Sequence, residues 1–89
     1  MNITNRPYKE VTLENLSYRI FSASIDETEL IWHRDAEDRT VEALHTTDWQ
    51  FQFDNELPIT FDKPIFIPKE KIHRVIKGNG DLHILIQKS

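Results

Sequence analysis

The chain has 89 residues, of which 15 are acidic and 11 basic, and a formal net charge of −4. It has no cysteine, which excludes disulfide bonds and thiolate metal sites, and its length predicts a single domain. No apolar stretch approaches the length of a bilayer span, so we expect no membrane partner. Residues 1–7 lack an apolar run and a cleavage pattern, and we therefore expect a cytoplasmic protein without a signal peptide.

Basic residues gather near the C-terminal end of the chain, at Lys69, Lys71, Arg74 and Lys77. Glu70 interrupts this cluster, and the rest of the chain is acidic on balance. Nucleic-acid-binding proteins normally carry a continuous basic stripe. The charge distribution therefore predicts no nucleic-acid partner.

Residues 1–28 give no single secondary-structure signal. The first ten residues are polar and are expected to form an arm. Residues 12–16 fit a short helical turn with Thr12 as its N-cap, and residues 18–25 fit either a strand or a helix. We therefore expect 1–28 to be an N-terminal arm with a first strand or helical turn, packed on a barrel formed by 29–89.

From Glu29 onward, short segments rich in β-branched and aromatic residues recur at near-regular spacing. In residues 49–54 aromatic and polar side chains alternate, so Trp49, Phe51 and Phe53 are expected to face a core. The pattern predicts an all-β sandwich or barrel. Its strands are expected at 30–34, 39–44, 49–54, 57–61, 65–67, 72–76 and 82–86.

Three side chains in this part of the chain are candidate metal ligands. His33 and Asp35 are two residues apart in an expected strand, so they share one face. His73 follows a proline-containing turn much later in the chain. Two imidazoles and one carboxylate form the facial triad that binds Fe(II) and related divalent ions. If the fold brings the three together, they are expected to hold Fe, Mn, Ni or Zn.

The order of these elements resembles a small single-domain cupin. The resemblance rests on the His-x-Asp of a first motif, an aromatic strand, Ile65-Phe66-Ile67-Pro68, a later histidine and a glycine-containing turn, and it covers residues 29–86. It implies a double-stranded β-helix, a jelly-roll barrel into which two motifs deliver metal ligands. By this resemblance His33 and His73 match ligand histidines, and Asp35 replaces a third.

The chain departs from the cupin pattern at the family's glutamate, which would fall near Arg39 or Thr40. The family's glycines are replaced by Asp62 and Glu70, and its trailing asparagine by Lys77. A cation at Arg39 opposes a bound metal ion through like-charge repulsion. Two alternatives follow: a metal held by the triad, or a metal-free pocket. In the second, Arg39 pairs with Asp35 or binds an anionic ligand through its planar fork.

Three functions are compatible with such a barrel. The first is a binding protein that holds a small polar or anionic ligand, such as a sugar or a carboxylic acid, at the barrel mouth. The second is a metal-dependent isomerase or dioxygenase-like enzyme. The third is a structural or oligomerising barrel with an inert pocket. For the first function the expected ligand-binding residues are Arg39, Arg74, Gln50 and Gln52.

Two further expectations concern the surface. His45 and His83 stand near strand ends without partners in the pattern, and we expect ordinary surface or packing histidines there. So small a barrel leaves strand edges and an apolar face to cover, so we expect a homodimer.

Overall fold

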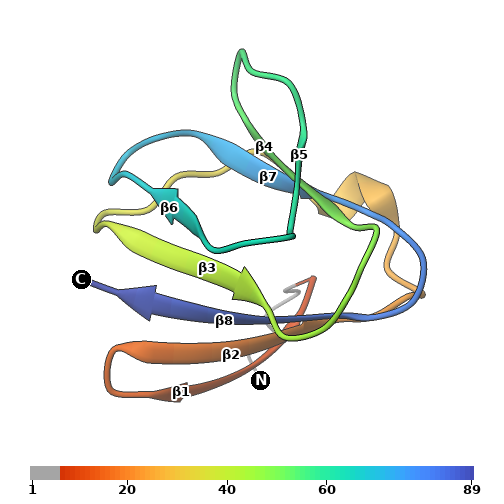
Figure 1. The fold of residues 1–89 in the computed structure, drawn as a ribbon, viewed down its shortest axis with the longest axis horizontal. Coiled ribbons are helices and arrows are strands. Elements are labelled where there is room, and N and C mark those ends of the chain that lie inside the picture. The colour runs from red at the N-terminus through yellow and green to blue at the C-terminus, as the bar shows by residue number, and fades with distance from the viewer. Residues whose placement is uncertain (1–6) are drawn as a thin grey trace, which may run out of the picture.

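The computed structural model describes residues 7–89, which form two antiparallel sheets that face each other (Figure 1). The larger sheet has the strand order β1-β2-β8-β3-β6, and the smaller sheet has the order β5-β4-β7. The expected all-β architecture is confirmed. The strands are β1 (Lys9–Leu13), β2 (Leu16–Phe21), β3 (Arg39–Ala43), β4 (Gln50–Phe53), β5 (Ile59–Thr60), β6 (Ile65–Ile67), β7 (His73–Ile76) and β8 (Leu82–Lys88), and a 3₁₀ turn spans Glu27–Glu29.

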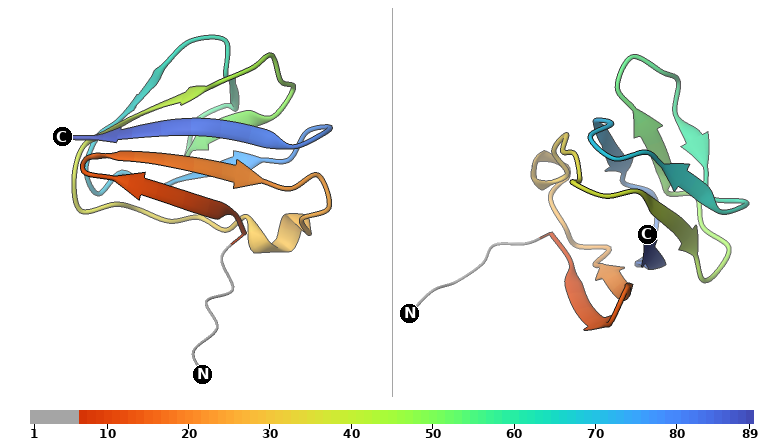
Figure 2. Two further views of the ribbon diagram at one scale, coloured as in Figure 1. Left: turned by 90° about the horizontal axis from the view of Figure 1, so that it is seen from below. Right: turned by 90° about the vertical axis from the view of Figure 1, so that its left-hand side faces the viewer.

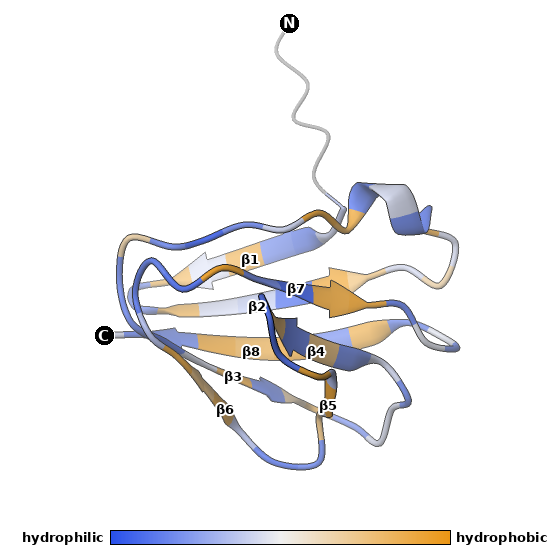
Figure 3. Ribbon diagram, turned by 90° about the horizontal axis from the view of Figure 1, so that it is seen from above, coloured by the Kyte–Doolittle hydropathy of each residue, from blue (hydrophilic) through white to orange (hydrophobic). Residues whose placement is uncertain are grey.

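Strand β8 shows how alternation builds the core. Its residues Leu82, Ile84 and Ile86 are buried, and the residues between them lie on the other face of the sheet. β8 pairs with β2 on one side and with β3 on the other, so it carries the middle of the larger sheet. From the smaller sheet Phe51 is buried as expected, next to a fully buried Trp49. Figure 3 shows the resulting hydrophobic segments along the strands, with hydrophilic residues in the loops.

The helical turn expected over residues 12–16 is wrong. β1 and β2 form a hairpin there, with Glu14 in the left-handed backbone region at φ 55°. β2 then pairs with β8 from Leu16 to Phe21, so the hairpin extends the larger sheet (Figure 2). This pairing overrides the local N-cap signal of Thr12, whose hydroxyl instead lies 3.2 Å from that of Ser17 across the hairpin. The expected N-terminal arm falls partly on residues 1–6, outside the described residues.

The strand expected over residues 30–34 is also wrong. This segment makes a single bridge, between His33 and His73. Two residues after the bridge, the Asp35 carbonyl accepts a hydrogen bond from the Glu70 N–H. Asp35 therefore contacts the turn that precedes β7 and does not pair with β7 itself. Ile31 remains 67% exposed because no strand covers it. The β-type composition of the segment thus reflects one bridge and one buried residue, Leu30.

The turn before β8 depends on a close approach that only glycine permits. A Cβ on Gly78 would lie 2.5 Å from the backbone nitrogen of Trp49 and 2.3 Å from Asp48 Oδ1. Asp48 in turn accepts hydrogen bonds from the backbone N–H and side-chain amide of Asn79. The indole N–H of Trp49 donates to the Gly80 carbonyl at 3.0 Å. These contacts fix the end of the smaller sheet to the start of β8.

We expect Gly78→Ala to destabilise the protein by about 1–3 kcal/mol, because the backbone of residues 48–49 must move to admit the methyl group. The measurement is urea denaturation followed by tryptophan fluorescence. Gly80→Asn is the control, since Gly80 has φ 73°, no atom near its Cβ position, and a conformation that asparagine tolerates. A Gly78→Ala variant as stable as Gly80→Asn would contradict this account.

Candidate functional site

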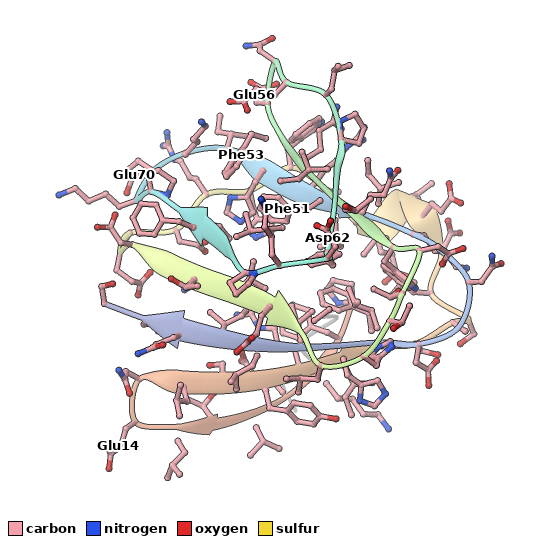
Figure 4. All side chains as sticks on the ribbon, viewed as in Figure 1. Glu14, Phe51, Phe53, Glu56, Asp62 and Glu70 are labelled. Carbon is pink, nitrogen blue, oxygen red and sulfur yellow. The ribbon has the colours of Figure 1, made fainter. Side chains whose placement is uncertain are left out.

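The two sheets enclose a cavity of about 250 Å³. This is slightly smaller than typical ligand pockets, which span about 300–1,000 Å³. Phe51 projects into the space between the sheets (Figure 4), and most of the wall is apolar. The ionisable residues that line the cavity are Tyr8, Arg19, Glu29, His33, Asp35, Arg39 and His73.

Backbone hydrogen bonds bring three of these residues together from distant parts of the chain. The His33 N–H donates to the His73 carbonyl at 3.0 Å, and the His73 N–H donates to the His33 carbonyl at 2.9 Å. The Glu70 N–H donates to the Asp35 carbonyl at 2.7 Å. As a result, His33, Asp35 and His73 each offer a ligand atom within 4.8 Å of the others. The structure thus gathers the three residues that sequence analysis singled out.

The hydrogen bonds of His73 show which of its two ring nitrogens carries the lone pair. Its Nδ1 lies 2.8 Å from the Lys71 carbonyl oxygen, so Nδ1 carries the proton and donates. Burial lowers the pKa of His73, and this outweighs the opposing effects of the Lys71 carbonyl and the Asp35 carboxylate. The imidazole is therefore neutral near neutral pH, and Nε2 presents a lone pair. That lone pair faces Asp35 Oδ2 at 3.4 Å.

Asp35 divides its two oxygens between different partners. Oδ1 lies 3.2 Å from Arg39 Nη1, whereas Oδ2 is the one fully buried side-chain polar atom of residues 7–89 without a hydrogen-bond partner. Two acceptors, Oδ2 and the Nε2 of His73, thus face each other with no hydrogen between them. A buried acceptor without a donor is costly, and a cation at this point relieves the cost for both atoms.

The donor set and spacing fit a divalent metal ion. Imidazole nitrogen and carboxylate oxygen are ligands for Zn(II), Fe(II), Mn(II) and Ni(II). Two ligands about 2.1 Å from one tetrahedral ion lie about 3.4 Å apart, which is the separation between Asp35 and His73. The side chain of His73 is also held in place, because its ring stacks on Phe51 with 5.3 Å between ring centroids.

Arg39 is compatible with a metal ion because it contacts Oδ1 of Asp35 and leaves Oδ2 without a partner. Its Nη2 lies 3.2 Å from Glu37 Oε2, and its side chain is 12% exposed. The two carboxylates offset its charge. The Arg39–Asp35 pair expected for a metal-free pocket is thus present, and it leaves Oδ2 available to an ion.

The other three expected ligand-binding residues lie outside the cavity lining. Gln50 and Gln52 alternate with the buried aromatic residues of β4, so they occupy the opposite face of the smaller sheet. Gln52 Oε1 accepts from Arg74 Nε at 2.9 Å, and the Arg74 guanidinium stacks 4.3 Å from the ring of Trp32. Of the four expected residues, Arg39 alone lines the cavity.

His45 and His83 form a separate group on the larger sheet. His45 Nε2 accepts from the backbone N–H of His83 at 3.0 Å, and His83 Nδ1 lies 2.5 Å from the hydroxyl of Tyr18. Both histidines therefore have partners that the sequence pattern did not show. Sequence analysis also missed Arg19 as a cavity residue. The available signal was the alternation Ser17, Arg19 and Phe21, which becomes an inward face once 16–21 is a strand.

Solved structures share this fold at low sequence identity. An RmlC-like cupin with a double-stranded β-helix fold from Methanocaldococcus jannaschii matches with a TM-score of 0.69 and 8% identity, over all of this chain and 85% of that one. A structure of DMSP lyases matches with a TM-score of 0.66 and 13% identity, over 82% of this chain. Fe(II)-HppE with (S)-1-HPP matches with a TM-score of 0.62 and 10% identity, over 92% of this chain.

This chain spans 36% of the DMSP lyase chain and 48% of the HppE chain. No protein-family model matches the sequence, and no curated protein is similar to it. Within residues 7–89, no helical segment has the length and apolar character needed to cross a membrane. The likeness to solved structures shows the double-stranded β-helix fold of the cupins, and it confirms the fold expected from the resemblance.

Glu70 carries backbone strain in the turn that holds Asp35. Its φ of 64° lies in the left-handed region, and it stands where the cupin pattern has a glycine. Among residues 7–89 its side chain makes only an exposed ion pair with Arg34 at 3.3 Å, which contributes little to stability. The position therefore favours glycine.

We expect Glu70→Gly to stabilise the protein by about 0.5–1 kcal/mol, because glycine adopts positive φ without steric cost. Glu70→Ala is the control: it removes the same ion pair but keeps the Cβ. Chemical denaturation of both variants checks the prediction. It would be wrong if the glycine variant were less stable than the alanine variant.

Proposed function

We propose that this chain is a metal-dependent small-molecule-binding protein with a cupin fold. His33, Asp35 and His73 hold one divalent ion, of the group Fe(II), Mn(II), Ni(II) and Zn(II), at the wall of the cavity. The observation that carries the proposal is the buried, unpartnered Oδ2 of Asp35 opposite the lone pair of His73. A cytoplasmic location and the absence of a nucleic-acid partner remain predictions from the sequence.

The chain's own residues would prepare this site for an exogenous ligand. Three protein ligands leave coordination positions open for an oxygen of a small molecule. Arg39 orients Asp35 through Oδ1, and the Lys71 carbonyl fixes the tautomer of His73. When bound, the ion supplies a Lewis acid that polarises the ligand's oxygen.

A metal-dependent isomerase or dioxygenase would use the same three ligands, so this alternative stands beside the binding function. Fe(II)-HppE, which shares the fold, holds iron according to its name. The third alternative, an inert structural barrel, gives no role to the unpartnered carboxylate oxygen. We therefore favour a functional cavity.

We expect the metal-stripped protein to bind one Zn(II) or Co(II) per chain, measured by calorimetry and by the visible spectrum of Co(II). His73→Gln and Asp35→Asn remove a ligand each and should weaken metal binding by about 100-fold or more. Loss of a residue that only hydrogen-bonds to a metal ligand typically weakens binding by about 10–100-fold. His83→Gln is the matched control, because His83 lies outside the cavity lining. Equal binding by all three variants would refute the metal site.

We also propose a homodimer that pairs the outer face of the larger sheet. Strand register places Val11 next to Tyr18 and Leu13 next to Leu16 on this face. Val11 is 69% and Leu13 71% exposed, and large exposed apolar faces are typical of interaction sites. A second copy presents the same face and buries it by symmetry.

Sedimentation velocity should show a dimer that dissociates on dilution. Leu13→Lys is expected to weaken dimerisation at least about tenfold, because it places a charge in an apolar contact. Leu57→Lys is the control, since Leu57 is 84% exposed in the loop between β4 and β5, away from this face. A monomer at all concentrations, or equal effects of the two substitutions, would overturn the proposal.

A further inference from the structure

Arg19 is a largely buried cation at the cavity wall, and it lies outside the triad. It lies on β2 with its side chain 12% exposed, and arginine is rarely buried without a partner. Its Nε donates to Glu10 Oε2 at 2.5 Å, directly across the β1–β2 register. Its Cζ lies 4.2 Å from the ring centre of Tyr8. These two contacts fix the plane of the guanidinium.

The same contacts leave the outer edge of the guanidinium for a ligand. Glu10 accepts a hydrogen bond from Nε, and the Tyr8 ring covers the flat face of the guanidinium. Within residues 7–89 the two Nη groups have no hydrogen-bond partner. Asp35 Oδ2 is the one side-chain polar atom of residues 7–89 that is both fully buried and without a partner. The Nη atoms of Arg19 have no partner in that range, so neither of them is fully buried. Arg19 lines the cavity, and these donors are the part of its side chain that its partners among residues 7–89 leave free. Two parallel N–H groups match the two oxygens of a carboxylate.

Strand register shows how far Arg19 lies from the triad. Arg19 pairs with Ile84 of β8, and Ile84 pairs with Ala43 of β3. Two strand spacings, about 10 Å, therefore separate Arg19 from β3. Arg39, which contacts Asp35, stands four residues before Ala43 on that strand. Between the two ends the sheet presents the buried residues Val41, Ile84 and Ile86, which all line the cavity.

Arg19 and the triad thus stand at the two ends of an apolar floor on the larger sheet, and Glu29 of the 3₁₀ turn adds one acidic group to the cavity lining. A sugar carries hydroxyl groups along its whole length, and an apolar floor leaves them without hydrogen-bond partners. A short carboxylic acid has its charge at one end and an apolar body. The distribution of polar groups therefore favours the carboxylic acid over the sugar.

We propose that the ligand of this cavity is a small carboxylate, that Arg19 binds its carboxyl group, and that Glu10 positions Arg19. The ligand's approach to the metal end rests on the function proposed above, whereas its contact with Arg19 requires no metal. Glu10 does not line the cavity, so it holds the guanidinium from behind. The competing account is that the Arg19–Glu10 pair only ties β1 to β2.

The test uses butyrate and its uncharged isostere butyramide as probes of the metal-stripped protein. Binding is followed by backbone amide NMR shifts, which also locate the site. Butyrate is expected to shift the amides of Phe21 and Ile84, and to bind at least tenfold more tightly than butyramide. Equal affinity for the two probes, or shifts confined to other parts of the chain, would overturn the proposal.

Two variants separate ligand binding from a structural role. Arg19→Lys keeps the charge and the pairing with Glu10 but loses the fork, and it should weaken butyrate binding at least fivefold while the protein stays folded. The double variant Glu10→Gln/Arg19→Gln avoids an unpaired buried charge and should lose the preference for butyrate over butyramide. Arg74→Lys is the matched control, since Arg74 lies outside the cavity lining, and it should change nothing. Wild-type butyrate affinity in Arg19→Lys would leave only the structural role.

The metal experiment fails or succeeds independently of this one. Butyrate binding at Arg19 without any metal binding at the triad would refute the proposed metal dependence and keep the carboxylate site. Metal binding with no preference for butyrate would do the reverse.

Discussion

The reciprocal pair of backbone hydrogen bonds between His33 and His73 is the contact on which the site depends. It is the single bridge that ties residues 30–35 to the smaller sheet. Because each residue both donates and accepts, the bridge fixes the two Cα positions and places the imidazole rings 4.3 Å apart, centroid to centroid. The turn at Glu70 then holds Asp35 beside them. Three backbone hydrogen bonds are thus enough to bring His33, Asp35 and His73 together from two distant segments.

The electrostatics of the site depend on the different surroundings of the two carboxylate oxygens of Asp35. A carboxylate with both oxygens paired with arginine would have no oxygen left for a metal ion. Arg39 pairs with Oδ1 alone, so Oδ2 remains available to a cation. Arg39, which falls near the glutamate of the cupin pattern, therefore does not compete with the aspartate as a ligand. It supports the aspartate that stands nearby.

The sequence predicted the fold and the three residues that the structure brings together, but it placed His33 and Asp35 on a strand that does not form. They share the cavity because a bridge and a turn hold them, whereas the expected strand did not form. Gln50 and Gln52 show a different limit. The alternation that correctly buried Phe51 also turns these two residues away from the cavity, so the pattern itself argued against them as ligands. The backbone strain at Glu70 and the unpartnered Oδ2 of Asp35 could not be predicted from the sequence, because both depend on the folded backbone.

Arg19 escaped prediction because a local signal competed with a non-local one. Thr12 as an N-cap favoured a helical turn, and only the pairing of β2 with β8 turns residues 17, 19 and 21 inward. The N-terminal hairpin consequently supplies the second polar end of a cavity whose first end comes from residues 33–73. A charged group enclosed by an apolar wall is held at a cost in desolvation, which its pairing with Glu10 offsets. A salt bridge that only ties β1 to β2 needs no place in the cavity lining, and Arg19 lines the cavity, which is why a ligand explains the arrangement better than stability does.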